Sequence, residues 1–240
     1  MSTVTQFAFA SGSIEPLVQG AWWEYLLWIP AAALLGFAVA AIFVSVLHLP
    51  RRVFLIPYVA LVGLFLYAFL RWSEISLTEL FRQNWILGVV GAVLVGVFLV
   101  RNIFSQPASM RATGLPLAFD LLWSGVIYGL IDALLLSVLP VLATWYAFSG
   151  LGWTDNWLGT IVVGILAFIA SLFITVCYHL GYPEYRVPRG VVGPSIGNGV
   201  MTFGYLLTNN PMTAIFSHIA MHIAGVWHGP ASVMQLPPHY

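Results

Sequence analysis

Four polar side chains stand out in this sequence because they interrupt long apolar stretches. Asp132 lies inside one such stretch, and two others contain or end with His179, His218 and His222. Ionisable groups are costly in the core of a bilayer, and those that occur there usually face the protein interior or a water-filled cavity. One carboxylate and three imidazoles on three separate segments therefore predict a buried functional site.

The spacing of the two late histidines indicates that they act on one object. His218 and His222 are four residues apart, so on a helix they share one face. Together with His179 and Asp132 they supply three nitrogen ligands and one oxygen ligand, a set that suits zinc or iron. All four residues are therefore candidates for both catalysis and metal binding. The plainer alternative is that each imidazole donates a hydrogen bond to a backbone carbonyl of a neighbouring helix.

Two other kinds of site remain open. Haem held by two imidazoles needs facing histidines at matching depth, such as His179 with His218 or His222, although the four-residue spacing on one helix favours a single metal centre. Ser195 lies in a G-x-S-x-G pattern and could pair with His218, as in a rhomboid-like serine protease. An all-helical chain lacks the strand-to-helix turn that G-x-S-x-G needs in soluble hydrolases. A glycine-rich start of a helix explains the pattern more simply.

The composition identifies the class of protein that must position these residues. Of the 240 residues, 60% are hydrophobic and only 7% are charged, and the mean hydropathy is +0.94. The formal net charge of zero gives no reason to expect a nucleic-acid partner. The single cysteine, Cys177, excludes an internal disulfide and a cysteine-rich zinc site. The sequence predicts an all-α, polytopic helical bundle in a lipid bilayer, with residues 1–240 forming a single membrane domain.

Seven apolar segments are candidate membrane helices. They cover residues 22–47, 53–70, 85–100, 118–147, 157–180, 195–208 and 211–227. The segment at 195–208 is short, since a helix of about twelve residues spans only ~18 Å, and we expect it to be short or re-entrant. A buried turn at residues 209–211 would then bring His218 and His222 toward the depth of Asp132.

The placement of the arginines predicts an orientation. Alternate breaks in the apolar pattern carry Arg51, Arg52, Arg101, Arg111, Arg186 and Arg189. The opposite breaks carry only Arg71 and Arg82. The positive-inside rule places the side with six arginines in the cytoplasm, with the N-terminus outside and the C-terminus inside a cytoplasmic membrane of bacterial or archaeal type.

Three connecting or terminal segments add further expectations. Residues 71–84 predict either a short amphipathic surface helix or a solvated loop. Glu184 and Arg186 follow His179 and are candidates for an ion pair that folds their loop over the site. The last six residues, 235–240, carry no formal charge, so we expect this tail to pack on the protein or on a partner.

The order of the polar residues resembles the CPBP family, which comprises CAAX proteases and bacteriocin-processing Abi proteins. These are glutamate-type intramembrane peptidases. Their core has a helix with Glu-Glu-x-x-x-Arg, a helix that ends Phe-x-x-x-His, and a later helix with His-x-x-x-Asn or His-x-x-x-Asp. The corresponding stretches here are residues 128–136, 173–180 and 214–222, and the resemblance covers roughly residues 115–228.

The resemblance implies roles for the four residues, but its motifs are only partly kept. His179 and His218 match exactly, whereas the other motif positions are occupied by Ile131, Asp132, Leu136, Thr175 and His222. In the family, the glutamate activates a water for attack on a peptide bond, while histidine and asparagine stabilise the oxyanion. The resemblance implies Asp132 as the general base and His179 or His218 as the group that polarises the carbonyl.

Two functions remain open at this point. The first is a divergent CPBP-like intramembrane peptidase or metal-dependent membrane hydrolase, with a buried Asp/His site that holds a divalent metal such as zinc or iron. The second is a catalytically degenerate CPBP-like protein that acts as a scaffold or accessory subunit, with other membrane subunits as partners. The missing glutamate and arginine favour the second function, and the additional imidazole of His222 favours the first.

Overall fold

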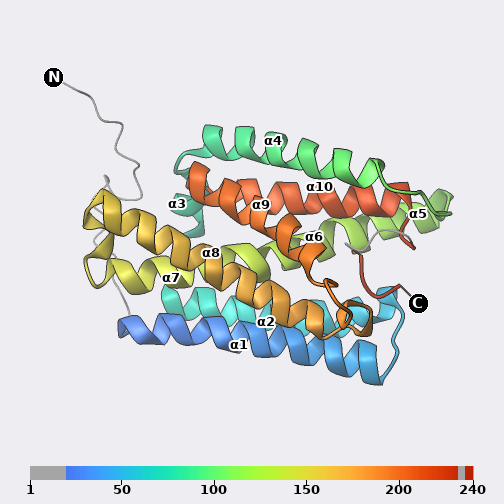
Figure 1. Ribbon diagram of the computed structural model, residues 1–240, viewed down its shortest axis with the longest axis horizontal. Helices are drawn as coiled ribbons and strands as arrows, with labels where there is room; N and C mark the ends of the chain where they lie inside the picture. Colours follow the sequence, from blue (N-terminus) through green and yellow to red (C-terminus); the bar gives the residue numbers. More distant parts are fainter. Residues whose placement is uncertain (1–19, 232–235, 240) are drawn as a thin grey trace.

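The computed structural model describes residues 20–231 and 236–239, and this part of the chain is an all-helical bundle without strands (Figure 1). The N-terminal tail, residues 1–19, lies outside the described residues. The helices before the centre of the chain are α1 (Trp22–Ala40) with the π-helical η1 (Ala41–Val46), α2 (Arg51–Ser73), α3 (Leu77–Arg82) and α4 (Trp85–Phe104). The helices after it are η4 (Trp153–Asp155), α8 (Trp157–Leu180), η5 (Pro183–Tyr185), α9 (Val192–Thr208) and α10 (Met212–His228).

Between these two groups lies one continuous helix of 36 residues, Gly114–Ser149, which we call the central helix. It consists of α5 (Gly114–Asp120), the π-helical η2 (Leu121–Ile127), α6 (Tyr128–Ala133), the π-helical η3 (Leu134–Val138) and α7 (Leu139–Ser149). The central helix is mostly buried by its neighbours, with 72% of its apolar window buried, whereas the other long helices have only 28–33% buried. Its two π-helical segments flank α6, which carries Asp132.

Five helices are long and apolar enough to cross a membrane, namely Trp22–Val46, Arg51–Ser73, Trp85–Phe104, Gly114–Ser149 and Trp157–Leu180. A helix satisfies its own backbone hydrogen bonds, which is what a lipid environment requires. Large apolar side chains such as Leu34, Leu64 and Leu94 point away from the bundle, where lipid can cover them. The predicted all-α membrane bundle is therefore confirmed.

The sixth and seventh predicted segments form α9 and α10, which have 17 residues each. At 1.5 Å per residue such a helix is about 26 Å long, slightly less than the hydrocarbon core of a typical bilayer. The turn between them, residues 209–211, is buried in the protein. This is the environment that an irregular backbone needs at membrane depth.

Asn210 explains how this turn tolerates burial. Its side-chain amide donates to the carbonyls of Phe81 (3.0 Å) and Gln83 (2.5 Å), and its Oδ1 accepts from the backbone N–H of Met212 (2.9 Å). The two carbonyls lie at the end of α3. Within the segment 71–84, for which the sequence predicts a short helix or a loop, residues 77–82 are helical and residues 71–73 belong to the end of α2. One side chain thus starts α10 and attaches it to α3.

The breaks that carry the six arginines named above lie together at one end of the bundle, which we call the arginine end (right in Figure 1). The C-terminal segment packs there, with Leu236, Pro237 and Pro238 all buried. The described part of the tail, residues 236–239, thus packs on the protein itself, whereas residues 235 and 240 lie outside the described residues. Arg186 donates to the carbonyls of neighbouring residues and to Ser45, whereas Glu184 faces His239, so the expected pairing of Glu184 with Arg186 is not formed.

We predict that Asn210→Ala lowers the free energy of unfolding by about 1–3 kcal/mol, because it removes the part-buried hydrogen bonds that join the end of α3 to the start of α10. The measurement is thermal unfolding in detergent. Asn102→Ala, which removes an exposed amide on α4, is the matched control and should change the stability by no more than about 0.5 kcal/mol. Equal melting temperatures for the two variants would contradict the role of Asn210.

Candidate metal centre

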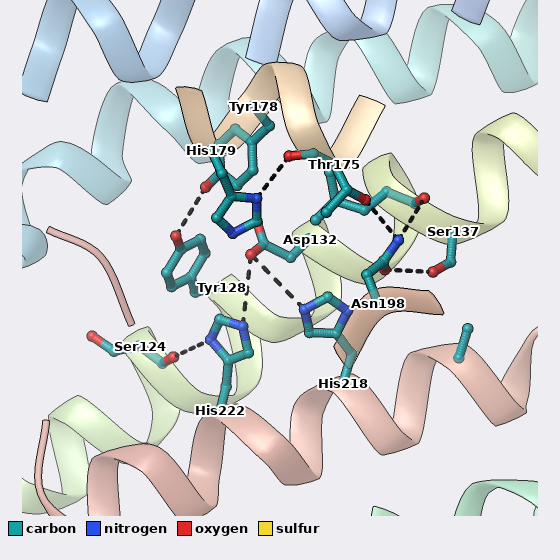
Figure 2. Close-up of polar contacts among 12 residues, drawn as sticks. Ser124, Tyr128, Asp132, Ser137, Thr175, Tyr178, His179, Asn198, His218 and His222 are labelled. Atoms are coloured by element: carbon teal, nitrogen blue, oxygen red, sulfur yellow. Dashed lines mark hydrogen bonds and ion pairs between the residues drawn. The ribbon is translucent and has the colours of Figure 1, made fainter. Parts of the chain in front are cut away.

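Three of the four predicted site residues come together in the interior of the bundle (Figure 2). Asp132 projects from α6, and His218 and His222 project from α10. Oδ2 of Asp132 lies 3.9 Å from Nε2 of His218 and 3.6 Å from Nε2 of His222. One ligand atom from each residue lies within 4.8 Å of the other two, and the side chains are at most 5% exposed.

Glycine allows α6 and α10 to approach this closely. A Cβ atom on Gly129 would lie 2.9 Å from Cα of Ile219 and 3.3 Å from the carbonyl oxygen of His218, so a side chain there would push α10 away. Gly125, one turn earlier, packs against Ile223 in the same way. The histidines at 218 and 222 follow the same four-residue spacing, so the glycine face of the central helix meets the histidine face of α10.

The π-helical segment η2 orients one of the imidazoles. A π-helical turn disrupts the regular i to i−4 ladder and is frequent at functional sites. In η2, the carbonyl of Ser124 accepts a hydrogen bond from Nδ1 of His222 (3.3 Å). A carbonyl only accepts, so Nδ1 carries the proton and Nε2 presents its lone pair to Asp132. Metal-binding histidines are commonly fixed in this manner.

Asp132 is oriented from the opposite side. Its Oδ1 accepts a short hydrogen bond from the hydroxyl of Tyr58, a fully buried residue of α2. This leaves Oδ2 facing the two histidines. The carboxylate is thus held by one helix and presented to another, which fixes its direction as a ligand or as a base.

His179 lies beside this group but does not belong to it. Its Nδ1 donates to the carbonyl of Thr175, one turn earlier in α8 (2.8 Å), and leaves Nε2 as an acceptor. The imidazole lies within electrostatic reach of His218 and His222, and Figure 2 shows it near Asp132. The structure therefore brings Asp132, His218 and His222 together and leaves His179 at the border of this group.

The spacing of the three ligand atoms suits a small metal ion. Ligand atoms about 2.0–2.1 Å from a tetrahedral zinc are about 3.3 Å apart, and the measured separations from Oδ2 are 3.6 and 3.9 Å. Two imidazoles and one carboxylate form catalytic zinc sites and non-haem iron sites, both with open positions for a substrate or a water. Nδ1 of His218 has no hydrogen-bond partner among the described residues, so this imidazole is not satisfied by the protein alone.

The alternative sites receive less support from the geometry. His218 and His222 face the carboxylate of Asp132, and His179 bonds to its own helix, so a haem held by His179 with His218 or His222 stays a prediction. Ser195 lies in the first turn of α9, and its hydroxyl has no hydrogen-bond partner within the described part of the chain. The rhomboid-like pairing of Ser195 with His218 is therefore not formed.

A group of buried tyrosines next to Asp132 was missed by the sequence analysis. The hydroxyls of Tyr128, Tyr178 and Tyr182 are mutually hydrogen-bonded, at 2.9 Å (128 to 178), 3.2 Å (128 to 182) and 2.6 Å (182 to 178). The ring of Tyr58 stacks on that of Tyr178. A sequence signal did exist, because Tyr128 precedes Asp132 by one helical turn and Tyr178 directly precedes His179.

A second missed group tethers α8 and α9 to the central helix. The amide of Asn198 on α9 donates to the hydroxyls of Ser171 (2.9 Å) and Thr175 (2.7 Å) on α8, and to the carbonyl of Leu136 in η3 (3.3 Å). Its Oδ1 accepts from Ser137 (2.9 Å). Since the carbonyl of Thr175 holds His179, this network reaches the border of the site.

We predict that Gly129→Ala lowers the free energy of unfolding by about 1–3 kcal/mol, because overpacking forces α10 away from the central helix. Thermal unfolding of the purified protein measures this change. Gly164→Ala on α8 adds the same methyl group where no atom lies within 4 Å, and it should leave the stability unchanged or slightly higher. If both variants unfold alike, the close contact at Gly129 is not a determinant of the bundle.

No protein-family model, no curated protein and no solved structure matches the chain. The resemblance to the CPBP family thus stays a prediction that rests on the sequence motifs around Asp132, His179 and His218. Because a fold alone does not define a function, the function must be argued from the chemistry of the site itself.

Proposed function

We propose that this protein is a metal-dependent membrane hydrolase whose divalent ion, zinc or iron, is held by Asp132, His218 and His222. The observation that carries the proposal is the convergence of one carboxylate oxygen and two imidazole nitrogens within 4.8 Å in the interior of an apolar bundle. Burying such a group costs free energy, which a bound ion would offset, and ionisable groups inside membrane proteins are commonly functional. The fixed orientations of Asp132 and His222 give further support.

The residues around the group divide the chemical tasks. A bound ion of this type supplies a polarised water and a Lewis acid for a substrate carbonyl. Tyr58 keeps Oδ1 of Asp132 occupied, and Ser124 keeps the proton of His222 on Nδ1. His179 is the nearby imidazole whose proton is held on Nδ1, and in this proposal its Nε2 takes up and returns a proton during hydrolysis.

The CPBP resemblance narrows the proposal to a peptide bond in a membrane-embedded or membrane-anchored substrate. It supports this reading through the order of Asp132, His179 and His218 along the chain. The substitution of His222 for the family's Asn or Asp supports a metal-dependent variant of that chemistry. In this proposal the ion takes over the role of one glutamate and of the arginine of the Glu-Glu-x-x-x-Arg motif. Ile131 and Leu136 occupy the positions of these two residues here.

Metal analysis of the purified protein tests this proposal. After exposure to zinc and removal of the excess, we expect about one ion per chain, and we expect its loss in His222→Ala and in Asp132→Asn. His48→Asn replaces a histidine outside the long helices with a residue that tolerates its positive φ, and it should keep the ion. An unmodified protein without metal, or a His222→Ala variant that still binds it, would contradict the proposed function.

A second candidate function is that of a scaffold or accessory subunit in a larger membrane complex. The observation that favours it is an apolar groove on the surface of the bundle between α4 and α10, lined by residues such as Val93, Val97 and Phe216. A groove of this kind suits a helix of another membrane subunit. For this function the metal experiment should give no bound ion, and Asp132→Asn should leave assembly unchanged.

We also propose that the arginine end faces the cytoplasm, in a cytoplasmic membrane of bacterial or archaeal type. The six arginines at that end, against Arg71 and Arg82 at the other, support this orientation. The C-terminus is then inside and the N-terminus outside. A reporter that is active only in the cytoplasm should therefore be active when it is fused to the C-terminus. If the fusion protein is present in normal amounts but the reporter is inactive, the C-terminus lies outside and the proposed orientation is reversed.

A further inference from the structure

Buried polar atoms without partners gather at the arginine end. Nε of Arg51 and Oε1 of Glu184 have no hydrogen-bond partner in the described part of the chain. The ring nitrogens of His239 lie near Glu184 and the carbonyls of Pro230 and Ala231, but form no hydrogen bond of normal geometry. Unpaired buried polar groups are rare in native proteins, and a frequent explanation is water that bridges them.

Arg51 connects this place with the metal centre. On one side its charge interacts with Glu184 and His239. On the other side it interacts with Tyr182 and with His222. Arg51 is therefore within electrostatic reach both of the loop that follows α8 and of His222.

Hydroxyl groups continue the polar path from Arg51 to the site. The hydroxyl of Tyr182 donates to that of Tyr178 (2.6 Å), and Tyr178 in turn interacts with Asp132. These tyrosines are fully buried, yet their hydroxyls face one another rather than an apolar wall. Buried water in proteins is held by polar partners of this kind.

The C-terminal segment covers the outer end of this path. Leu236 is fully buried in the hydrophobic core, next to Pro237 and Pro238, which are also buried. The N–H of His239 donates to Glu184 (3.4 Å), and Arg51 donates to the carbonyl of Pro230, which precedes the segment (2.8 Å). The segment is thus attached to the two residues at the outer end of the path, and its movement would uncover them.

Glu184 and His239 combine partial exposure with pKa shifts that burial causes. Glu184 and His239 are about 20% exposed. Burial raises the pKa of the Glu184 carboxyl and lowers the pKa of the His239 imidazole. Both groups are thus shifted toward their neutral forms, and neither forms a closed ion pair that would seal the path.

We infer that Arg51, Glu184 and His239 line a hydrated entrance to the buried site and that residues 236–239 form its lid. The inference rests on the proposed function, because a hydrolase with a buried centre must admit water. The guanidinium of Arg51 also suits the passage of small anions, such as the carboxylate that hydrolysis of an amide releases.

X-ray radiolytic footprinting tests the entrance without any metal, because hydroxyl radicals formed from bound water oxidise the side chains beside it. We expect oxidation of Tyr182 in spite of its burial, several-fold above that of Phe69, which is equally buried in α2. Leu236→Asp and a chain that ends at Ala231 should both raise the oxidation of Tyr182 further. Val187→Asp adds the same charge to an exposed site of the loop and should not.

Oxidation of Tyr182 that stays at the level of Phe69, and that neither lid variant changes, would overturn the inference. The link to the metal centre is measured by the rate at which azide changes the visible spectrum of the cobalt-substituted protein. We expect about a tenfold faster change in Leu236→Asp than in Val187→Asp, with unchanged cobalt content. Equal rates would show that the lid does not control the site. If cobalt does not bind, the proposed function fails, while the footprinting result still decides on the entrance.

Discussion

The contact between the central helix and α10 is the constraint on which the site depends. Gly125 and Gly129 leave no side chain between the two helices, so the backbone of α10 packs directly on α6 and η2. That short distance allows the imidazoles of His218 and His222 to reach a carboxylate as short as that of Asp132. A wider contact would leave three polar groups buried apart from one another, at a cost of several kcal/mol.

The surrounding helices then orient what this contact brings together. Tyr58 from α2 holds one oxygen of Asp132, and Ser124 in the central helix holds one nitrogen of His222. On the far side, Asn198 attaches α9 to α8 and to η3, near the turn that carries His179. Each orienting partner is a side-chain hydroxyl or amide, or a backbone carbonyl, in an otherwise apolar interior, where the low dielectric strengthens such hydrogen bonds.

The helices could be predicted from the sequence because a long apolar stretch in a membrane must satisfy its own backbone hydrogen bonds, which an α-helix does. The convergence of Asp132, His218 and His222 could be anticipated from their types and from the four-residue spacing. The position of His179 at the border of the group could not be predicted. Its Nδ1 donates to a carbonyl of its own helix, and no sequence pattern indicates this hydrogen bond. Arg186 was also misjudged, since nearby carbonyls satisfy it in place of Glu184. Tertiary packing alone decides such competitions between partners.

The π-helical segments of the central helix have a consequence for how this chain tolerates insertions and deletions. A π-helical turn holds about one residue more than an α-helical turn, so it stores an extra residue within a continuous helix. Deleting a single residue from Leu121–Ile127 would restore α-helical geometry and leave the two flanking parts of the central helix in nearly the same rotational relation, because the residue removed is the stored one. Asp132 would then still face α10. The π-helical segment thus lets the central helix lose a residue without changing the direction of the site carboxylate.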